Sequence, residues 1–186
     1  GVDRFGRPVL YNCFACSSAR GPHGLLAHFT MKVEECIQKM QVPGMDTWVW
    51  IADFEGFGVK DGMDPRFSIW LIHMFQNHYP ERMGCVVCID APRLFSVLWS
   101  AVKPITSLST RRKIMFIRGE ESRKELADAL FEGTTAQWLK ENMSFNRRRK
   151  EVKASWAQPH PMPPEVDAAS KITEIANTAQ KVNWQA

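Results

Sequence analysis

Residues 77–90 read NHYPERMGCVVCID and join a polar cluster around Pro80 to a continuous apolar run. A short apolar run bounded by turn residues is typical of a strand that is buried on both faces, as strands in parallel sheets are. The polar cluster before it can be a solvated loop, but a histidine, a glutamate and an arginine around one proline can also line a binding site. The rest of the chain has to distinguish these two interpretations.

Apolar runs of the same kind alternate with stretches of helical periodicity along the chain. We expect strands at residues 8–14, 47–53, 84–90 and 113–118. A helical stretch separates the first two strands. A second helix is predicted to begin at Asp64, which can cap it, and Pro65, which suits the first helical position. This alternation predicts an α/β fold in which helices cover a sheet.

The composition places limits on the class of protein. The 186 residues are 45% apolar, which is enough for one domain with a sizeable core. The formal net charge of +4 suits an anionic membrane or a phosphate-bearing ligand, and we expect no nucleic-acid partner. Nothing resembles a secretory signal, and no stretch approaches the ~20 apolar residues that span a bilayer. We therefore expect a cytoplasmic protein.

The five cysteines include two close pairs, Cys13/Cys16 and Cys85/Cys88. Zinc ribbons usually place the second pair about 15–20 residues after the first, on turns, whereas these pairs lie far apart in apolar runs. A redox dithiol also fits Cys85 and Cys88 poorly, because no helix start follows them. The pattern favours reduced core thiols and no metal site.

Two later segments bear on domain organisation. Residues 92–104 contain an apolar helical stripe that ends at a Lys-Pro pair. The stripe either packs on the sheet or forms a movable lid over an apolar cavity, and its pattern does not separate the two. From Arg147 the sequence becomes basic and then proline-rich. We therefore expect a folded domain at residues 1–146 and a linker with a weakly amphipathic tail at residues 147–186.

Several motifs occur together in a fixed order: DRFGRPVLY (3–11), WIADFEGFG (50–58), FQNHYPERMG (75–84), IDAPRLFSVLW (89–99) and STRRKIMFI (109–117). In this order they resemble the CRAL-TRIO family of lipid-binding domains, and most closely its yeast phosphatidylinositol-transfer (Sec-fourteen-like) branch. The resemblance covers roughly residues 1–131. It implies a mixed, mostly parallel sheet that floors a hydrophobic lipid cavity, closed by a gating helix at residues 92–108. It also implies that the helical segment that usually precedes this domain, with a further basic headgroup contact, is missing from the sequence.

The resemblance assigns a role to the polar cluster. In that branch the glutamate of Y-P-E-R and the threonine and lysine of T-x-x-K help hold the phosphoinositol headgroup, and here they are Glu81, Thr110 and Lys113. Lysine can donate charge-assisted hydrogen bonds to phosphate, threonine can donate a hydroxyl, and glutamate can accept from inositol hydroxyls. Arg82 either neutralises phosphate or pairs with Glu81. The spacing alone favours a loop ion pair, a helix cap and an exposed basic face.

Bulky apolar residues are candidates for the cavity lining, although such residues are equally ordinary core. The candidates are Trp48, Trp50, Phe75, Phe95, Leu98, Trp99 and Met115. Trp48 and Trp50 stand where a serine and a threonine of the yeast protein help bind phosphatidylcholine, which argues against phosphocholine binding. Two tryptophans could narrow the cavity toward compact ligands such as the tocopherol, retinoids or squalene that relatives bind.

Together these features predict non-enzymatic binding and transfer of a lipid, with phosphatidylinositol as the expected ligand and a transient membrane surface as partner. The sequence contains no nucleophile elbow and no phosphate-cradling glycine loop, and we expect no cofactor. Two alternatives stay open: a carrier of a compact hydrophobic ligand, and a scaffold that recruits protein partners through its surface or C-terminal tail. The leading interpretation places the protein in the cytoplasm, peripheral on membranes.

Overall fold

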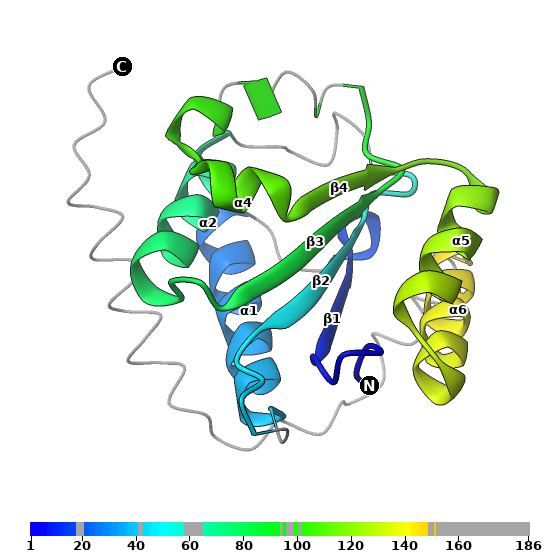
Figure 1. The fold of residues 1–186 in the computed structure, drawn as a ribbon. Helices are drawn as coiled ribbons and strands as arrows, with labels where there is room; N and C mark the ends of the chain where they lie inside the picture. The colour runs from blue at the N-terminus through cyan, green and yellow to red at the C-terminus, as the bar shows by residue number, and fades with distance from the viewer. Residues whose placement is uncertain are drawn as a thin grey trace.

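A four-stranded parallel sheet forms the centre of the computed structural model, with the strands in the order β1-β2-β3-β4 (Figure 1). The strands are β1 (Val9–Cys13), β2 (Trp48–Asp53), β3 (Met83–Ile89) and β4 (Ile114–Ile117). The structure describes residues 1–17, 21–40, 43–57, 65–93, 95, 99–100, 102–148 and 151. All four predicted strands are present, so the predicted α/β fold with a mostly parallel sheet is confirmed.

Helices cover both faces of this sheet (Figure 1). The longer ones are α1 (Gly21–Gln38), α2 (Pro65–His78), α5 (Glu120–Leu130) and α6 (Gly133–Arg147). Shorter helical segments are η1 (Phe14–Cys16), η3 (Lys103–Ile105) and α4 (Leu108–Arg112). Helix α2 ends just before Tyr79, because a residue that precedes a proline is biased away from helical backbone. Helix α5 begins at two glutamates, whose negative charge stabilises a helix N-terminus.

Helices α1 and α2 pack on one face of the sheet, here called the α1/α2 face. Side chains alternate along a strand, so Trp48, Trp50 and Ala52 of β2 all point to this side. They join a cluster that includes the following residues of the other elements: Leu10, Leu26, Phe29, Val33, Cys36, Met74, Tyr79, Val86 and Cys88. The α1/α2 face is therefore rich in aromatic rings.

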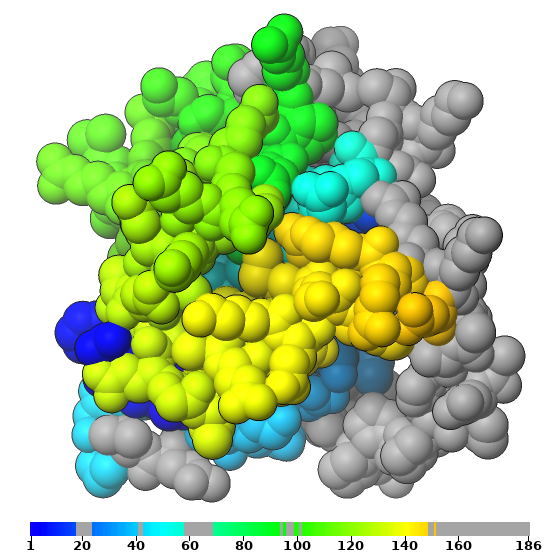
Figure 2. Space-filling view, turned by 90° about the vertical axis from the view of Figure 1, so that its right-hand side faces the viewer, coloured from blue at the N-terminus to red at the C-terminus, as the bar shows by residue number. Residues whose placement is uncertain are grey.

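Helices α5 and α6 pack on the opposite face, the α5/α6 face, and Figure 2 shows them covering that side of the molecule. The alternate residues of β2, Val49 and Ile51, point to this side together with Val9 of β1 and Val87 of β3. Leu139 of α6 and Phe131, which follows α5, close the cluster, and each is 2% exposed. Strand β2 is thus buried along its whole length, as the apolar run predicted.

The cysteine pairs do not form a common site. Cys85 joins the cluster on the α5/α6 face and Cys88 the cluster on the α1/α2 face, because residues three apart in a strand point to opposite sides. All five cysteines are free, and burial raises the pKa of the Cys88 thiol to about 12. Across the described ranges, no group of three or more His, Cys, Asp or Glu side chains could hold a metal ion.

The segment predicted to gate the cavity, residues 92–108, is described only in part, and Leu98 lies outside the described residues. Its described portion includes η3 and the beginning of α4. Most of the predicted linker and tail, from residue 152 onward, also lies outside them. Within the described part of the chain, none of the helices is both long enough and apolar enough to cross a membrane.

Candidate functional site

The loop between α2 and β3 carries the first headgroup candidate, Glu81. Its backbone has φ 56°, in the left-handed region that non-glycine residues rarely adopt. The Arg82 N–H donates to the Tyr79 carbonyl at 3.2 Å, and the Arg82 carbonyl accepts from Trp48 N–H at 3.1 Å. The turn is therefore attached to the start of β2, and it presents a Glu81 side chain that is 77% exposed. Residues held in this strained region are concentrated at functional sites.

Lys113 lies across from this loop, at the junction between α4 and β4. Its Nζ is 2.8 Å from Glu81 Oε2. The position of Lys113 is set by the sheet, because its carbonyl accepts from Val86 N–H at 2.8 Å, next to where β3 and β4 pair. Two loops separated by more than thirty residues in sequence therefore bring a carboxylate and an ammonium group together at the amino ends of adjacent strands.

Thr110, the third candidate, lies in α4 one helical turn before Lys113. Ser107 caps this helix: its Oγ accepts from Thr110 N–H at 3.1 Å and is 2.8 Å from Thr110 Oγ1. Residues three apart on a helix share a side, so Thr110 and Lys113 lie near one another. The structure thus gathers Glu81, Thr110 and Lys113 at one edge of the domain.

Arg82 does not join this pair. Its Nη2 lies 3.4 Å from the sulfur of Met40, just beyond the end of α1. Of the two interpretations of Arg82, the pairing with Glu81 is not seen among the described residues, where the cation that contacts Glu81 is Lys113. The other interpretation of Arg82, neutralisation of a phosphate, stays a prediction.

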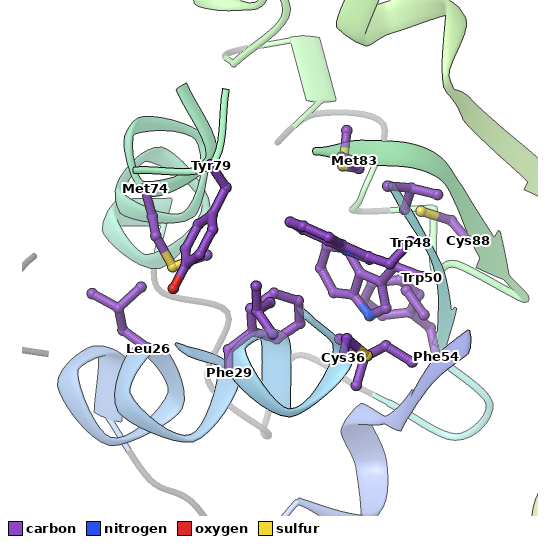
Figure 3. Close-up of a cluster of buried hydrophobic side chains, with 14 of the residues drawn as sticks. Leu26, Phe29, Cys36, Trp48, Trp50, Phe54, Met74, Tyr79, Met83 and Cys88 are labelled. Atoms are coloured by element: carbon purple, nitrogen blue, oxygen red, sulfur yellow. The ribbon is translucent and has the colours of Figure 1, made fainter. Parts of the chain in front are cut away.

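Three of the predicted lining residues meet in the aromatic layer between β2 and the helices α1 and α2. Two of them, Trp48 and Trp50, are seen in Figure 3. Trp48 is fully buried and Trp50 is 6% exposed. The ring of Phe75, from α2, lies 6.0 Å from Trp48 and 6.1 Å from Trp50 between centroids. Phe29 of α1 approaches Trp50 to 4.4 Å, and Tyr79 meets Trp48 edge-on at 5.8 Å. The tryptophans therefore lie under the helices, enclosed by other rings.

The two described lining candidates of the 92–108 segment, Phe95 and Trp99, pack at the β4 edge of the same face. Phe95 lies 5.0 Å from Phe54 and 5.7 Å from Phe116 between ring centroids. Trp99 meets the Phe116 ring at 5.8 Å. The described part of the segment is thus in contact with both the end of β2 and the outer strand.

The prediction for Met115 requires correction, because it lies on the other face of the sheet. Met115 pairs with Val87, whose side chain belongs to the α5/α6 face, whereas Phe116 pairs with Cys88 on the α1/α2 face. Phe116 is 47% exposed and contacts both aromatic rings of the 92–108 segment. The signal that could have identified Phe116 is the alternation of side chains along β4 once its register is known.

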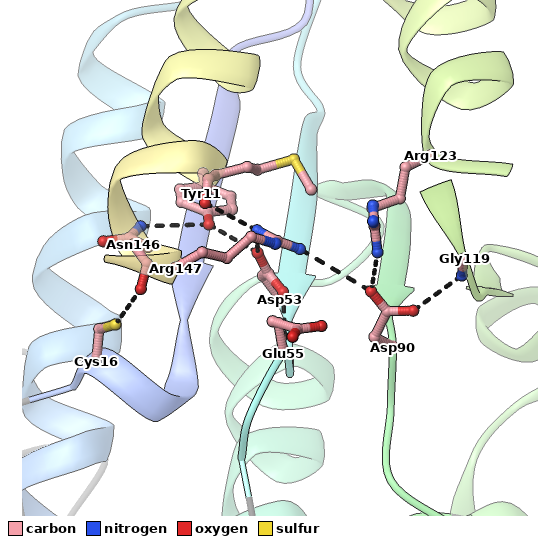
Figure 4. A network of polar contacts seen from close by, with 10 residues as sticks. Tyr11, Cys16, Asp53, Glu55, Asp90, Gly119, Arg123, Asn146 and Arg147 are labelled. Carbon is pink, nitrogen blue, oxygen red and sulfur yellow. Dashed lines mark hydrogen bonds and ion pairs between the residues drawn. The ribbon is translucent and has the colours of Figure 1, made fainter. Parts of the chain in front are cut away.

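A second polar group lies on the α5/α6 face, at the carboxyl end of the sheet (Figure 4). Asp53, fully buried at the end of β2, accepts hydrogen bonds from Tyr11 Oη at 2.8 Å and Arg147 Nη1 at 3.1 Å. The Glu55 N–H donates to its other oxygen at 3.0 Å. Burial, and then the Asp53 charge, raise the pKa of Tyr11, so its hydroxyl stays a donor. Burial, the largest single contribution, lowers the pKa of Arg147, but the charge and hydrogen bond of Asp53, with smaller contributions from Tyr11 and Glu55, together raise it above its usual value.

Asp90, which follows β3, extends this network to α5. One of its oxygens accepts from Gly119 N–H at 3.0 Å, and the other pairs with Arg123 and lies 3.9 Å from Arg147. Both carboxylates stand at the ends of strands that the sequence predicted, at residues 53 and 90. The structure uses both carboxylates to hold α5 and α6 to the sheet, and the sequence carried no signal for Arg147 as their partner.

Comparison with known proteins identifies the fold. The sequence matches the family model of the CRAL/TRIO domain over residues 1–130. The chain therefore belongs to the CRAL/TRIO domain family, whose members bind lipophilic ligands. This family membership confirms the broader part of the resemblance, while the yeast branch remains a hypothesis.

Curated relatives come from a nematode and from insects. A CRAL-TRIO domain-containing protein of Caenorhabditis elegans is 30% identical over 105 residues, which are 52% of this chain and 14% of that protein. Protein real-time of Drosophila pseudoobscura pseudoobscura is 29% identical over 87 residues, 46% of this chain and 13% of its own length. Protein real-time of Anopheles gambiae is 32% identical over 82 residues, 42% and 12% respectively. The chain thus matches only a small part of each of these longer proteins.

Proposed function

We propose that this domain binds phosphatidylinositol and transfers it between membranes without chemical change. The observation that carries the proposal is the Glu81–Lys113 pair, 2.8 Å apart, with Thr110 one helical turn away. These residue types supply the three functions that an inositol phosphate needs: a cation for phosphate, a hydroxyl donor, and an acceptor for ring hydroxyls. They are the positions that the family resemblance assigned to the headgroup.

The exposure of the pair supports a binding role over a purely structural one. The Glu81 and Lys113 side chains are 77% and 27% exposed, and an ion pair this open contributes about 0–1 kcal/mol to stability. A ligand phosphate can therefore compete for Lys113 at small energetic cost. The left-handed backbone of Glu81 is a further local strain that packing elsewhere has to offset.

A membrane surface is the proposed transient partner. Arg112 lies exposed on α4, beside Lys113, and Arg111 lies next to it with its Nε donating to the Thr106 carbonyl at 2.9 Å. Basic residues near a membrane add roughly 1 kcal/mol each of attraction to anionic lipid. Leu108 and Ile105, 67% and 46% exposed, add apolar contact at the same place. We infer a peripheral, cytoplasmic protein that exchanges lipid there.

The test is transfer of phosphatidylinositol from donor to acceptor vesicles by wild type, Lys113→Ala and Lys113→Arg. We expect Lys113→Ala to transfer about tenfold more slowly, the loss corresponding to about 1.4 kcal/mol of headgroup binding, with partial recovery in Lys113→Arg. Lys140→Ala is the matched control, because Lys140 is an exposed lysine of α6. Mass spectrometry should recover the lipid unaltered.

Three outcomes would contradict parts of this proposal. Undiminished transfer by Lys113→Ala would remove the headgroup assignment. A chemically altered lipid would contradict transfer without turnover. Failure of the wild-type protein to bind any lipid would contradict the carrier function and favour a scaffold that acts through protein partners.

A further inference from the structure

Two cysteine pairs share the spacing C-x-x-C, but the backbone places their thiols differently. Cys85 and Cys88 lie in β3, where residues three apart are separated by about 10 Å and point to opposite faces. Cys13 ends β1 and is the N-cap of the 3₁₀ helix η1, whose last residue is Cys16. A 3₁₀ helix rises about 2 Å per residue and aligns side chains three apart, so the Cα atoms of Cys13 and Cys16 lie about 6 Å apart. A disulfide can span that separation.

The thiols of Cys13 and Cys16 are also more accessible than the other thiols of the chain. Both residues are partly exposed, whereas Cys36, Cys85 and Cys88 are buried. Thiol–disulfide exchange begins when a thiolate reaches the sulfur of another molecule, so it requires this access. The Cys13/Cys16 pair therefore differs from the core thiols that the sequence pattern favoured.

The surroundings of the pair make its two thiols unequal. Burial, and then the neighbouring Cys16 side chain, raise the pKa of the Cys13 thiol to about 12, with a smaller contribution of the same sign from Asp53. The two sulfur atoms are neighbours, because the Cys16 side chain forms a hydrogen bond with that of Cys13. A thiol that stays protonated is a poor nucleophile, so Cys16 is the thiol that attacks first.

Cys16 also holds the end of α6. Its Sγ donates to the Asn146 carbonyl at 3.2 Å, as Figure 4 shows. Carbonyl groups in the last turn of an α-helix have no partner within the helix, so the thiol supplies a donor there. Asn146 Nδ2 donates in turn to Tyr11 Oη at 3.2 Å. The next residue, Arg147, pairs with Asp53, so a change at the Cys16 sulfur reaches the contacts that dock α6.

We propose that Cys13 and Cys16 form a redox-active dithiol that glutathione disulfide oxidises to an intramolecular disulfide. The Cys16 thiolate attacks one sulfur of glutathione disulfide, which forms a mixed disulfide and releases one glutathione thiolate. The Cys13 sulfur then attacks the Cys16 sulfur and releases the second glutathione. The two thiol protons pass to the two glutathione molecules, and glutathione disulfide gains the two electrons that the protein loses.

Oxidation of the pair changes how α6 is held. A disulfide sulfur carries no proton, so the Asn146 carbonyl loses the donor that Cys16 supplies. Disulfides in a reducing cytoplasm are rare and are mostly catalytic or redox-sensing, so the pair is expected to be reduced at rest, as it is in the structure. The inference goes beyond the proposed lipid transfer and does not depend on it.

The test incubates the reduced wild-type protein with an excess of glutathione disulfide and then blocks the remaining thiols under denaturing conditions. Peptide mass spectrometry should find Cys13 linked to Cys16, with the loss of two hydrogen atoms, and dithiothreitol should reverse the link. Cys85 and Cys88 are the internal control, because they have the same spacing and should both remain free thiols. Absence of a link between Cys13 and Cys16 would overturn the inference, and its result leaves the proposed lipid transfer untouched.

Two variants test the order of the steps. Cys13→Ser should accumulate glutathione on Cys16, because no second thiol is left to displace it. Cys16→Ser should take up glutathione on Cys13 at least about tenfold more slowly, because burial keeps that thiol protonated. Equal rates in the two variants would contradict Cys16 as the first nucleophile.

Hydrogen exchange measures the effect on α6 in the wild-type protein. Oxidation should make the backbone amides of residues 143–148 exchange severalfold faster, while those of α5 keep their rates. The reduced Cys16→Ala variant should show the same change, since it also lacks the thiol donor. Unchanged exchange in the oxidised protein would overturn the link between the dithiol and α6.

Discussion

The two faces of the sheet differ although the same strands build both. On the α5/α6 face the core side chains are mostly aliphatic, and Asp53 has hydrogen-bond donors from three residues. On the α1/α2 face aromatic rings predominate, and the indole N–H groups of Trp48 and Trp50 are unused among the described residues. The difference teaches that the two faces hold their helices by different means: charged contacts at the strand ends fix α5 and α6, whereas ring packing fixes α1 and α2.

The largest expected effect distinguishes the faces by their response to lipid. Phe29→Ala on α1 and Leu139→Ala on α6 each remove a side chain that is at most 3% exposed, so each should lower the free energy of unfolding by about 3 kcal/mol. Added lipid should restore part of the loss in Phe29→Ala, because ligand binds the folded state and fills the space. Urea unfolding with and without vesicles measures this, and equal lipid responses in the two variants would contradict the comparison.

The second-largest expected effect is a loss of stability when the polar network around Asp53, on the α5/α6 face, is broken. Asp53→Ala removes the acceptor shared by Tyr11 and Arg147 and leaves the arginine charge without its partner. We expect a loss of about 2 kcal/mol, below the value for a fully buried pair, because the Arg147 side chain is 27% exposed and keeps some water. Asp128→Ala is the control, since its contact with Lys140 is exposed and long at 3.9 Å. Similar losses in the two variants would show that the network does not hold α6.

The pH dependence of stability probes the thiols of the α1/α2 face. Burial raises the pKa of Cys36 to about 11 and that of Cys88 to about 12. In the unfolded chain these thiols ionise near pH 9, so above that pH the folded state binds more protons than the unfolded state and stability falls. As the pH rises from 8 to 10, ionisation of each thiol in the unfolded chain should lower the free energy of unfolding by about 1 kcal/mol.

The measurement for the thiols is urea unfolding at several pH values under reducing conditions. A variant carrying both Cys36→Ala and Cys88→Ala should lose less stability over the same pH range than the wild type, whatever its stability at pH 8. An identical decline in the two proteins would show that these thiols are not the cause.

The smallest expected effect concerns the loop outside both faces. Glu81→Gly relieves the left-handed backbone strain but removes the exposed contact with Lys113. The relief should exceed the loss of the ion pair, so we expect stability to rise by about 0.5 kcal/mol while phosphatidylinositol transfer falls. Thermal unfolding together with the transfer assay checks both, and a stability decrease would mean that the pair contributes more than its exposure suggests.

The sequence predicted the four strands to within one residue at each end. Apolar runs, turn residues and helix caps act over a few neighbouring positions, so their effects can be read locally. The order of the motifs also indicated the family. The same resemblance led to the hypothesis that Glu81, Thr110 and Lys113 form one headgroup site. Burial of Trp48 and Trp50 followed from the same apolar run.

Only the tertiary structure decided which side chains share a face and which charges meet. Both Met115 and Phe116 are apolar, so the assignment depends on the pairing of β4 with β3, which no local pattern encodes. The contact between Asp53 and Arg147 joins residues 94 positions apart and requires α6 to dock on the sheet. The physical reason is that backbone preferences are local, whereas the partners of buried polar and apolar groups are set by how distant elements pack together.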